Sequence, residues 1–152
     1  MGYYISLGAS NWHLPAEHEE AALQVLKDLN KPENNHLKRG GSYTGGEKTM
    51  HWYAWMPSDY DEHVTSVEGV LNMLGFETHR DESGTTITFY DQKQGNEDIF
   101  LNALAPFMAD GSYIDWTGED GARWRFIYEG GKMYVQEAIT VWNADKRELS
   151  LA

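Results

Sequence analysis

The chain has 152 residues and no cysteine, and its net charge is −12. Hydrophobic residues make up 41% of the sequence and aromatic residues 13%, which predicts one folded domain rather than a disordered chain. The absence of cysteine excludes disulfides, thiolate metal sites and cysteine nucleophiles within this sequence.

The N-terminal segment MGYYISLGASNW lacks the basic and long apolar regions of a secretory signal peptide. No apolar run in the sequence reaches the roughly 20 residues that a membrane-spanning helix needs. We therefore expect a cytoplasmic protein that does not contact a membrane.

In chain order, residues 2–7 predict a first strand. Residues 15–29 predict a helix, because Pro15 suits its first position and leucines follow at helical spacing. Residues 31–49 are polar and glycine-rich, which predicts a long flexible loop. Residues 50–56 then have the composition of a strand.

A second helix is expected after Pro57, with Ser58 or Asp59 as its cap and Gly75 just beyond its end. Residues 76–80 and 85–90 predict a hairpin around a four-residue polar turn.

A third helix is expected from Asn96, with Pro106 in its last turn. Residues 111–142 predict three antiparallel strands joined by glycine turns, and residues 143–152 a polar tail. The fold class is therefore α+β: a single domain over residues 1–152, with an antiparallel sheet and about three helices packed on one face.

The acidic charge is concentrated in the middle of the sequence. Residues 58–120 contain fourteen acidic residues against Arg80 and Lys93, a net charge of −12, whereas residues 1–57 carry −1 and residues 121–152 carry +1. Such a segment repels phosphate, so we expect no direct binding of nucleic acid. It attracts a basic groove on a protein, or it serves only as a solvated surface.

Motifs for nucleotide and metal binding are incomplete. Residues 40–49 approach a phosphate-binding loop, but Glu47 occupies the position that requires lysine. The residues from Asp59 to His63 form the densest group of metal-ligand types, yet Val64 stands where a calcium-binding loop requires glycine. We expect no metal, no cofactor and no catalytic residues.

The leading hypothesis is a non-enzymatic binding protein that contacts the basic surface of a host protein. In its sharpest form the acidic surface mimics DNA, as an inhibitor of the anti-CRISPR type would. The expected contacts are the exposed carboxylates of the acidic segment: Asp59, Asp61, Glu62, Glu68, Asp81, Glu82, Glu97 and Asp98.

A second hypothesis is a small enzyme or ligand-binding domain with a site between residues 31–49 and the sheet. Its side chains would be His36, Arg39, Tyr43, His51 and Arg123. Arg123 and Arg125 alternate on one face of a strand, where they would bind a carboxylate or phosphate, or pair with the acidic segment; we favour the pairing. A third hypothesis is a structural homo-oligomer that buries this outer face.

The pattern GSYIDWxGEDGxxWR, followed by GK and a closing VW, lies within residues 111–142. It resembles an uncharacterised family of small proteins from phages and actinomycete-type bacteria. The resemblance covers the last third of the chain and a few N-terminal residues. It implies a fold and a phage or mobile-element origin, but no catalytic residues.

Overall fold

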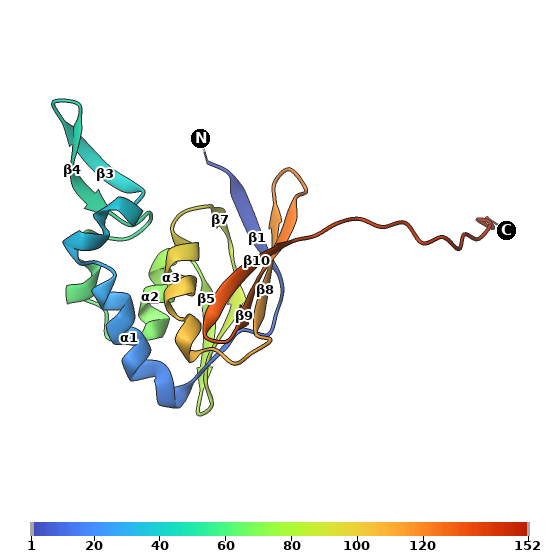
Figure 1. Ribbon diagram of the computed structural model, residues 1–152, viewed down its shortest axis with the longest axis horizontal. Coiled ribbons are helices and arrows are strands. Elements are labelled where there is room, and N and C mark those ends of the chain that lie inside the picture. The colour runs from blue at the N-terminus through green and yellow to red at the C-terminus, as the bar shows by residue number, and fades with distance from the viewer. Residues whose placement is uncertain (1, 152) are drawn as a thin grey trace.

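The helices lie beside one face of a five-stranded antiparallel sheet (Figure 1). The structure is a computed structural model that describes residues 2–151; Met1 and Ala152 of the expected domain lie outside the described residues. The sheet has the strand order β10-β9-β8-β1-β7. Its strands are β1 (Tyr4–Ser10), β7 (Asp91–Lys93), β8 (Tyr113–Gly118), β9 (Arg123–Glu129) and β10 (Lys132–Glu137). The predicted α+β class with an antiparallel sheet and a final three-stranded meander is confirmed.

A three-stranded sheet continues the five-stranded one through a bend. It contains β2 (His13–Pro15), β5 (Glu77–Asp81) and β6 (Gly84–Phe89) in the order β2-β6-β5. Tyr4 pairs with Lys93, and His13 pairs with Thr86. Between these two pairs, the N-terminal chain is therefore two residues longer than the chain that it faces. Side chains of both sheets, among them Ile5 and Ile114 of the larger and Leu14 and Ile87 of the smaller, contribute to one hydrophobic core.

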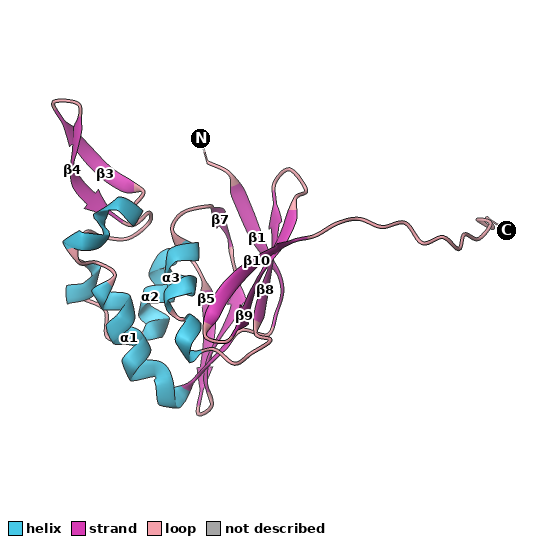
Figure 2. Ribbon diagram, in the orientation of Figure 1, coloured by secondary structure: helices cyan, strands magenta, loops and turns pink. Residues whose placement is uncertain are grey.

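Within residues 2–151, three α-helices and four short 3-10 segments form the helical layer (Figure 2). The α-helices are α1 (Glu19–Asp28), α2 (Val67–Leu74) and α3 (Glu97–Ala103). The 3-10 segments are η1 (Ala16–His18), η2 (Pro32–Leu37), η3 (Tyr60–Glu62) and η4 (Ala105–Phe107).

The second helix begins later than the sequence predicts. Ser66, not Ser58 or Asp59, caps α2, and its Oγ accepts a hydrogen bond from the amide of Gly69 at 2.9 Å. Gly75 closes the helix in a left-handed conformation with φ of 109°, as predicted.

The prediction of a loop over residues 31–49 is wrong. The segment forms η2 and a hairpin of β3 (Gly40–Thr44) and β4 (Glu47–Trp52). Gly45 and Gly46 both have positive φ, which is the requirement of a tight two-residue hairpin turn. The side chains of the hairpin are exposed or half-buried, so neither strand needs an apolar side. The sequence therefore lacks the alternation of apolar and polar residues that predicts a strand.

The third strand of the meander ends earlier than predicted. β10 stops at Glu137, and Trp142, which was expected in that strand, is 88% exposed. The amide of Ala138 bonds to the carbonyl of Arg123 at 3.0 Å, and Arg123 is the first residue of β9. Residues beyond 138 therefore have no further residue of β9 to pair with.

The core contains two groups of packed aromatic rings. Trp116 of β8 contacts Phe76, Tyr90 and Phe126, with ring centroids 5.5–6.1 Å apart. A second group, formed by Tyr53, Tyr60 and Phe100, lies among the helices, with centroids 4.9–6.3 Å apart. Large buried rings of this kind supply much of the apolar area that stabilises a small domain.

Buried tyrosine hydroxyls bond to helix carbonyls. Tyr60 donates to the carbonyl of Leu26 at 2.7 Å, and Tyr53 donates to that of Leu29 at 2.8 Å. Both carbonyls lie at the C-terminal end of α1, where they have no acceptor role inside the helix. Burial raises the pKa of Tyr53 to about 12, which keeps this donor protonated.

Asn96 connects three segments of the chain. Its Oδ1 accepts hydrogen bonds from the amides of Arg39 (3.2 Å) and Ala54 (2.9 Å), and its Nδ2 donates to the carbonyl of Leu37 at 3.1 Å. The side chain is fully buried. Asn96 was expected to cap α3; it makes no such bond and instead holds η2 and the ends of the β3–β4 hairpin against that helix.

The change Asn96→Ala should therefore lower the free energy of unfolding by about 1–3 kcal/mol, because it leaves three partly buried backbone groups without their partner. Urea unfolding followed by circular dichroism measures the loss. Asn102→Ala, at an exposed position of α3, is the matched control and should cost less than about 1 kcal/mol. Equal losses in the two variants would contradict the connecting role of Asn96.

Candidate interaction surfaces

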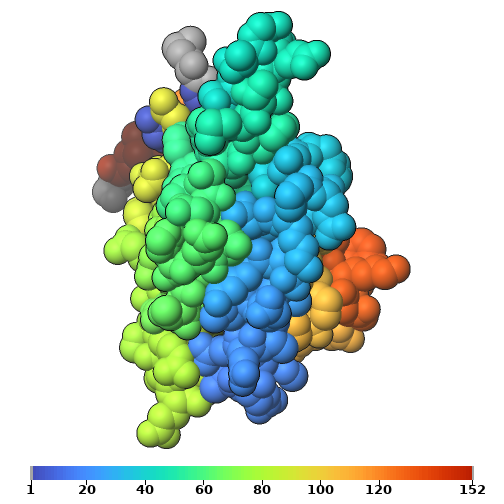
Figure 3. All heavy atoms as spheres, turned by 90° about the vertical axis from the view of Figure 1, so that its left-hand side faces the viewer, coloured from blue at the N-terminus to red at the C-terminus, as the bar shows by residue number. Residues whose placement is uncertain are grey.

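The folded chain separates its charge between two sides. Residues 16–31 and 57–82, which form α1, η3, α2 and β5, contain eleven acidic residues and three lysines or arginines, a net charge of −8. The five strands of the large sheet contain four of each sign, and residues 110–138, which include the turns between its last three strands, carry six acidic and three basic residues, a net charge of −3. Figure 3 shows that α1 (blue), residues 58–70 (green) and the β5–β6 hairpin (yellow-green) lie side by side on one face. We call this the helical face.

The eight acidic residues predicted as contacts differ in exposure. Four of them are exposed on the helical face: Asp59, Glu62, Asp81 and Glu82. Asp61, Glu68 and Asp98 are half-buried, and Glu97 is buried.

The half-buried carboxylates are already bonded within the fold. Asp61 accepts from Asn30 Nδ2 at 2.6 Å, and Glu68 accepts from Thr78 Oγ1 at 2.7 Å. Asp98 lies 3.5 Å from the Arg39 guanidinium. These three carboxylates therefore contribute less to the outer surface than the four exposed ones.

Two exposed carboxylates are held in place by neighbours. Asp81 accepts from the amide of Ser83 at 2.8 Å and from its hydroxyl at 2.6 Å, and these bonds lower the pKa of Asp81. Asp59 pairs with His63 at 3.0 Å, which lowers the pKa of the carboxyl and raises that of the imidazole. Glu62 joins this pair, and the three groups offer ligand atoms within 4.8 Å of one another. All three are exposed and one pair is already bonded, so the geometry gives no specific support to metal binding.

Glu97 lies in the interior at 2% exposure. Its Oε2 accepts hydrogen bonds from the amide of Gly95 at 2.8 Å and from the Tyr90 hydroxyl at 3.3 Å. Burial raises the pKa of Glu97, because the charged form is poorly solvated there. A buried carboxyl of this kind supports the local fold and does not face a partner.

The outer face of the large sheet carries an ion pair. Arg125 of β9 binds Asp115 of β8 through two contacts at 2.5 and 3.1 Å, and its guanidinium lies 4.3 Å from the ring centroid of Tyr113. The pairing of Arg125 with the acidic segment is thus confirmed. Among the described residues, Arg123 makes no such ion pair, and it is exposed.

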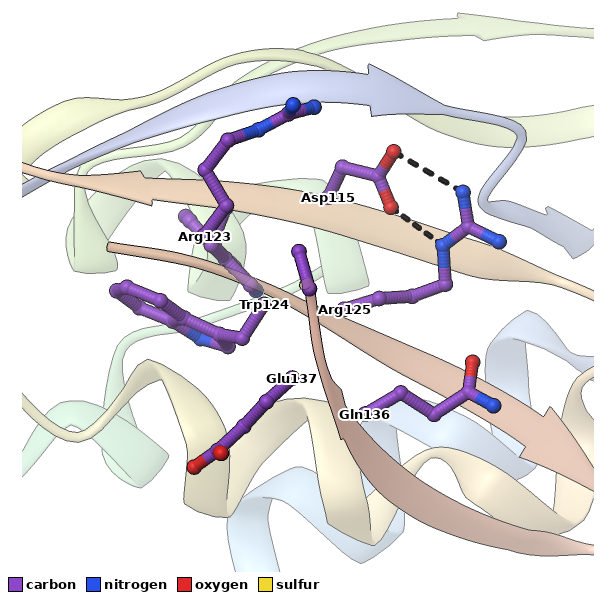
Figure 4. Close-up of a pocket in the computed structure, with 8 residues that line it drawn as sticks. Asp115, Arg123, Trp124, Arg125, Gln136 and Glu137 are labelled. Atoms are coloured by element: carbon purple, nitrogen blue, oxygen red, sulfur yellow. Dashed lines mark hydrogen bonds and ion pairs between the residues drawn. The ribbon is translucent and has the colours of Figure 1, made fainter. Parts of the chain in front are cut away.

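A surface hollow of about 290 Å³ lies beside this pair. In Figure 4, Arg123 lies on the same side of β9 as Asp115 and Arg125, whereas Trp124 points the other way. Gln136 of β10 and Ala138 complete the rim. A second, smaller hollow is lined by β1, Asp91 and residues 117–119. Neither hollow includes a residue from 31–49.

The residues predicted for a ligand site are divided between two parts of the fold. Tyr43 and His51 lie on the β3–β4 hairpin, which projects beyond the helices, whereas Arg123 lies on β9 in the large sheet (Figure 1). His36 is exposed on η2, and Arg39 bonds to the carbonyl of Gly95. The structure does not bring Arg123 to the other four residues.

None of the helices within residues 2–151 combines the length and the apolar character required to cross a bilayer. Comparison of the sequence and structure with protein-family models, curated proteins and solved structures gave no match. The resemblance to small phage and actinomycete-type proteins therefore stays a prediction.

The raised pKa of Glu97 has a consequence for stability. Protonated Glu97 contributes to the free energy of unfolding. This contribution is fully present below the ordinary carboxyl pKa of 4.5 and is lost as the pH rises through the raised pKa of Glu97. Glu97→Gln does not titrate, so its free energy of unfolding should rise relative to wild type above about pH 4.5. The expected gain is about 1.4 kcal/mol for each unit by which the pKa is raised. Urea unfolding across a pH series measures this difference.

Glu47→Gln is the control, because it removes a carboxylate that is exposed on β4, away from Glu97. Its unfolding free energy should run parallel to that of wild type over the same pH range. Parallel curves for Glu97→Gln and wild type would show that the buried carboxyl has no raised pKa.

Proposed function

We propose that this chain is a non-enzymatic protein-binding module whose acidic helical face engages a basic surface of another protein. The observation that supports it is the segregation of charge, with −8 on the segments of the helical face and zero on the strands of the large sheet. A one-sided field of this kind attracts and orients a basic partner before contact.

The exposed carboxylates suit this role because part of the face is ordered in advance. Asp81 is fixed by Ser83 and Asp59 by His63, so these side chains lose less conformational freedom on binding than free ones would. Glu82 follows Asp81 and Glu62 precedes His63 in the sequence, and both glutamates are exposed.

The narrower proposal is that the partner binds nucleic acid or serves host defence, and that the helical face occupies its phosphate-binding groove as a DNA mimic. A group of exposed carboxylates, two of which are held by neighbouring side chains, has the charge that such a groove recognises. The phage or mobile-element origin implied by the resemblance is consistent with an inhibitor of this type. No observation on the described residues favours the second hypothesis, a ligand site formed with Arg123.

The test uses two baits of equal charge in affinity purification from the source cells. The first carries Asp59→Asn, Glu62→Gln, Asp81→Asn and Glu82→Gln on the helical face. The control carries Asp91→Asn, Glu129→Gln, Glu137→Gln and Glu148→Gln, which lie outside that face. We expect wild type and the control to retain the same basic protein, and the first bait to lose it at least tenfold.

Retention should fall steeply when salt rises from about 50 mM to about 500 mM, because exposed charges are screened over a few ångströms at the higher value. Duplex DNA should compete with the chain for the purified partner. If both baits retain the partner equally, or if salt has no effect, the charge-driven function is wrong. If salt and the first bait both reduce binding but DNA does not compete, only the DNA-mimic form fails.

A further inference from the structure

β10 is an edge strand of the large sheet with a free hydrogen-bonding side. The amide of Ala138 bonds to Arg123, and Ala138 lies two residues beyond Gln136, so the even-numbered residues of β10 direct their backbone groups toward β9. The odd-numbered residues Met133, Val135 and Glu137 therefore direct their amides and carbonyls away from the sheet. Within residues 2–151 no strand pairs with this side.

This edge lacks most features that keep edge strands from pairing. β10 has six residues, contains no proline and pairs with β9 without a bulge. Its apolar side chains are exposed at the centre of the strand, with Tyr134 at 48% and Val135 at 61%. A regular, partly apolar edge of this kind is a template for another strand.

The segment after β10 is rich in apolar residues that the fold does not cover. It leaves the sheet as an extended chain (Figure 1), and its large apolar side chains are 72–88% exposed: Ile139, Val141, Trp142, Leu149 and Leu151. Solvent-exposed apolar residues in this number indicate a contact surface. The segment begins where β10 ends, so one partner could cover both.

The distribution of charge favours a second copy of the chain as the partner of the β10 edge. A second copy of the chain carries −12 and is repelled by the helical face, with its −8, whereas residues 123–138, which form β9 and β10 at this edge, carry three basic and two acidic residues. The β10 edge is thus a place where two copies can approach at a lower electrostatic cost than at the helical face.

We propose that two copies of this chain pair through β10 and form a continuous ten-stranded antiparallel sheet across a two-fold axis at Val135. Two-fold pairing of antiparallel strands places side chains of the same face opposite one another. With the axis at Val135, Val135 faces Val135 and Met133 faces Glu137 of the second copy. Residues 132–138 then overlap completely, and no like charges stand opposite.

Of the registers with the axis on an odd-numbered residue of β10, two others are less favourable. An axis at Glu137 would place two glutamates opposite one another, and an axis at Met133 would place Glu129 opposite Glu137. With the axis at Val135, the segment after Ala138 runs past Gly131 of the second copy, which lies close to Pro106 in its own chain. Ile139 would meet that turn and lose part of its exposed apolar surface.

The test exploits the position of Val135 on the axis. Wild type should sediment at twice the chain mass of 17.3 kDa in analytical ultracentrifugation. Val135→Lys and Val135→Glu each place like charges opposite one another, and each variant alone should be a monomer. An equimolar mixture of the two should recover the dimer. Val135→Thr, a neutral β-branched control, should remain dimeric.

Amide hydrogen exchange gives an independent readout. In the wild-type dimer the amides of Met133, Val135 and Glu137 should exchange at least tenfold more slowly than in the Val135→Lys monomer. Circular dichroism and cooperative unfolding confirm that both charged variants fold. A monomeric wild type between about 1 and 100 μM, dimeric single charge variants, or a mixture that stays monomeric would each overturn the proposal. The helical face takes no part in this contact, so the dimer and the proposed function fail separately.

Discussion

The helical layer depends on buried tyrosine hydroxyls that must each find an acceptor. A buried hydroxyl without a partner costs more than one hydrogen bond contributes, so its position is strongly constrained. Tyr53 and Tyr60 take carbonyls at the C-terminal end of α1, and Tyr128 of β9 takes the carbonyl of Leu101 in α3 at 2.9 Å. The packed aromatic rings thus supply the buried apolar area. Their hydroxyls determine which residue of each helix packs against them, because each hydroxyl bonds to one particular carbonyl. The bond from Tyr128 joins α3 to one face of the large sheet, and the opposite face carries the Asp115–Arg125 pair.

This one-sided arrangement separates the two surfaces of the molecule. The helical face collects the acidic side chains, because α1, η3, α2 and the β5–β6 hairpin all lie there. The open face of the sheet balances its charges, most clearly in the Asp115–Arg125 pair. The proposed basic partner and the proposed second copy of the chain would therefore use different sides and would not compete for the same residues. Glu97 is buried and so does not contribute to the acidic surface; its carboxyl instead accepts a hydrogen bond from the amide of Gly95, just before α3.

Local signals were sufficient for some elements and not for others. The β5–β6 hairpin and the strands of the meander were predicted because turn residues separate short runs of strand-forming residues. α2 was recognised from its apolar stripe and Gly75, but its start was misplaced, because several nearby residues can cap a helix and only the fold selects Ser66. The β3–β4 hairpin was missed because its exposed strands lack a buried side. Asn96 was read as a cap, since its partners Leu37 and Ala54 lie more than forty residues away.

The sequence by itself determined the quantities that are summed or local: the net charge, the absence of thiol chemistry, and the alternation that puts Arg123 and Arg125 on one face of β9. The tertiary structure alone decided which carboxylates face solvent, which residue pairs with Arg125, and that the odd-numbered backbone groups of β10 are free. The physical reason is that burial and strand pairing join residues far apart in the chain. Asp115 and Arg125 are ten residues apart, but Glu19 and Arg80, which also form an ion pair, are separated by sixty-one. Composition cannot specify such partners, because they depend on how the layers pack.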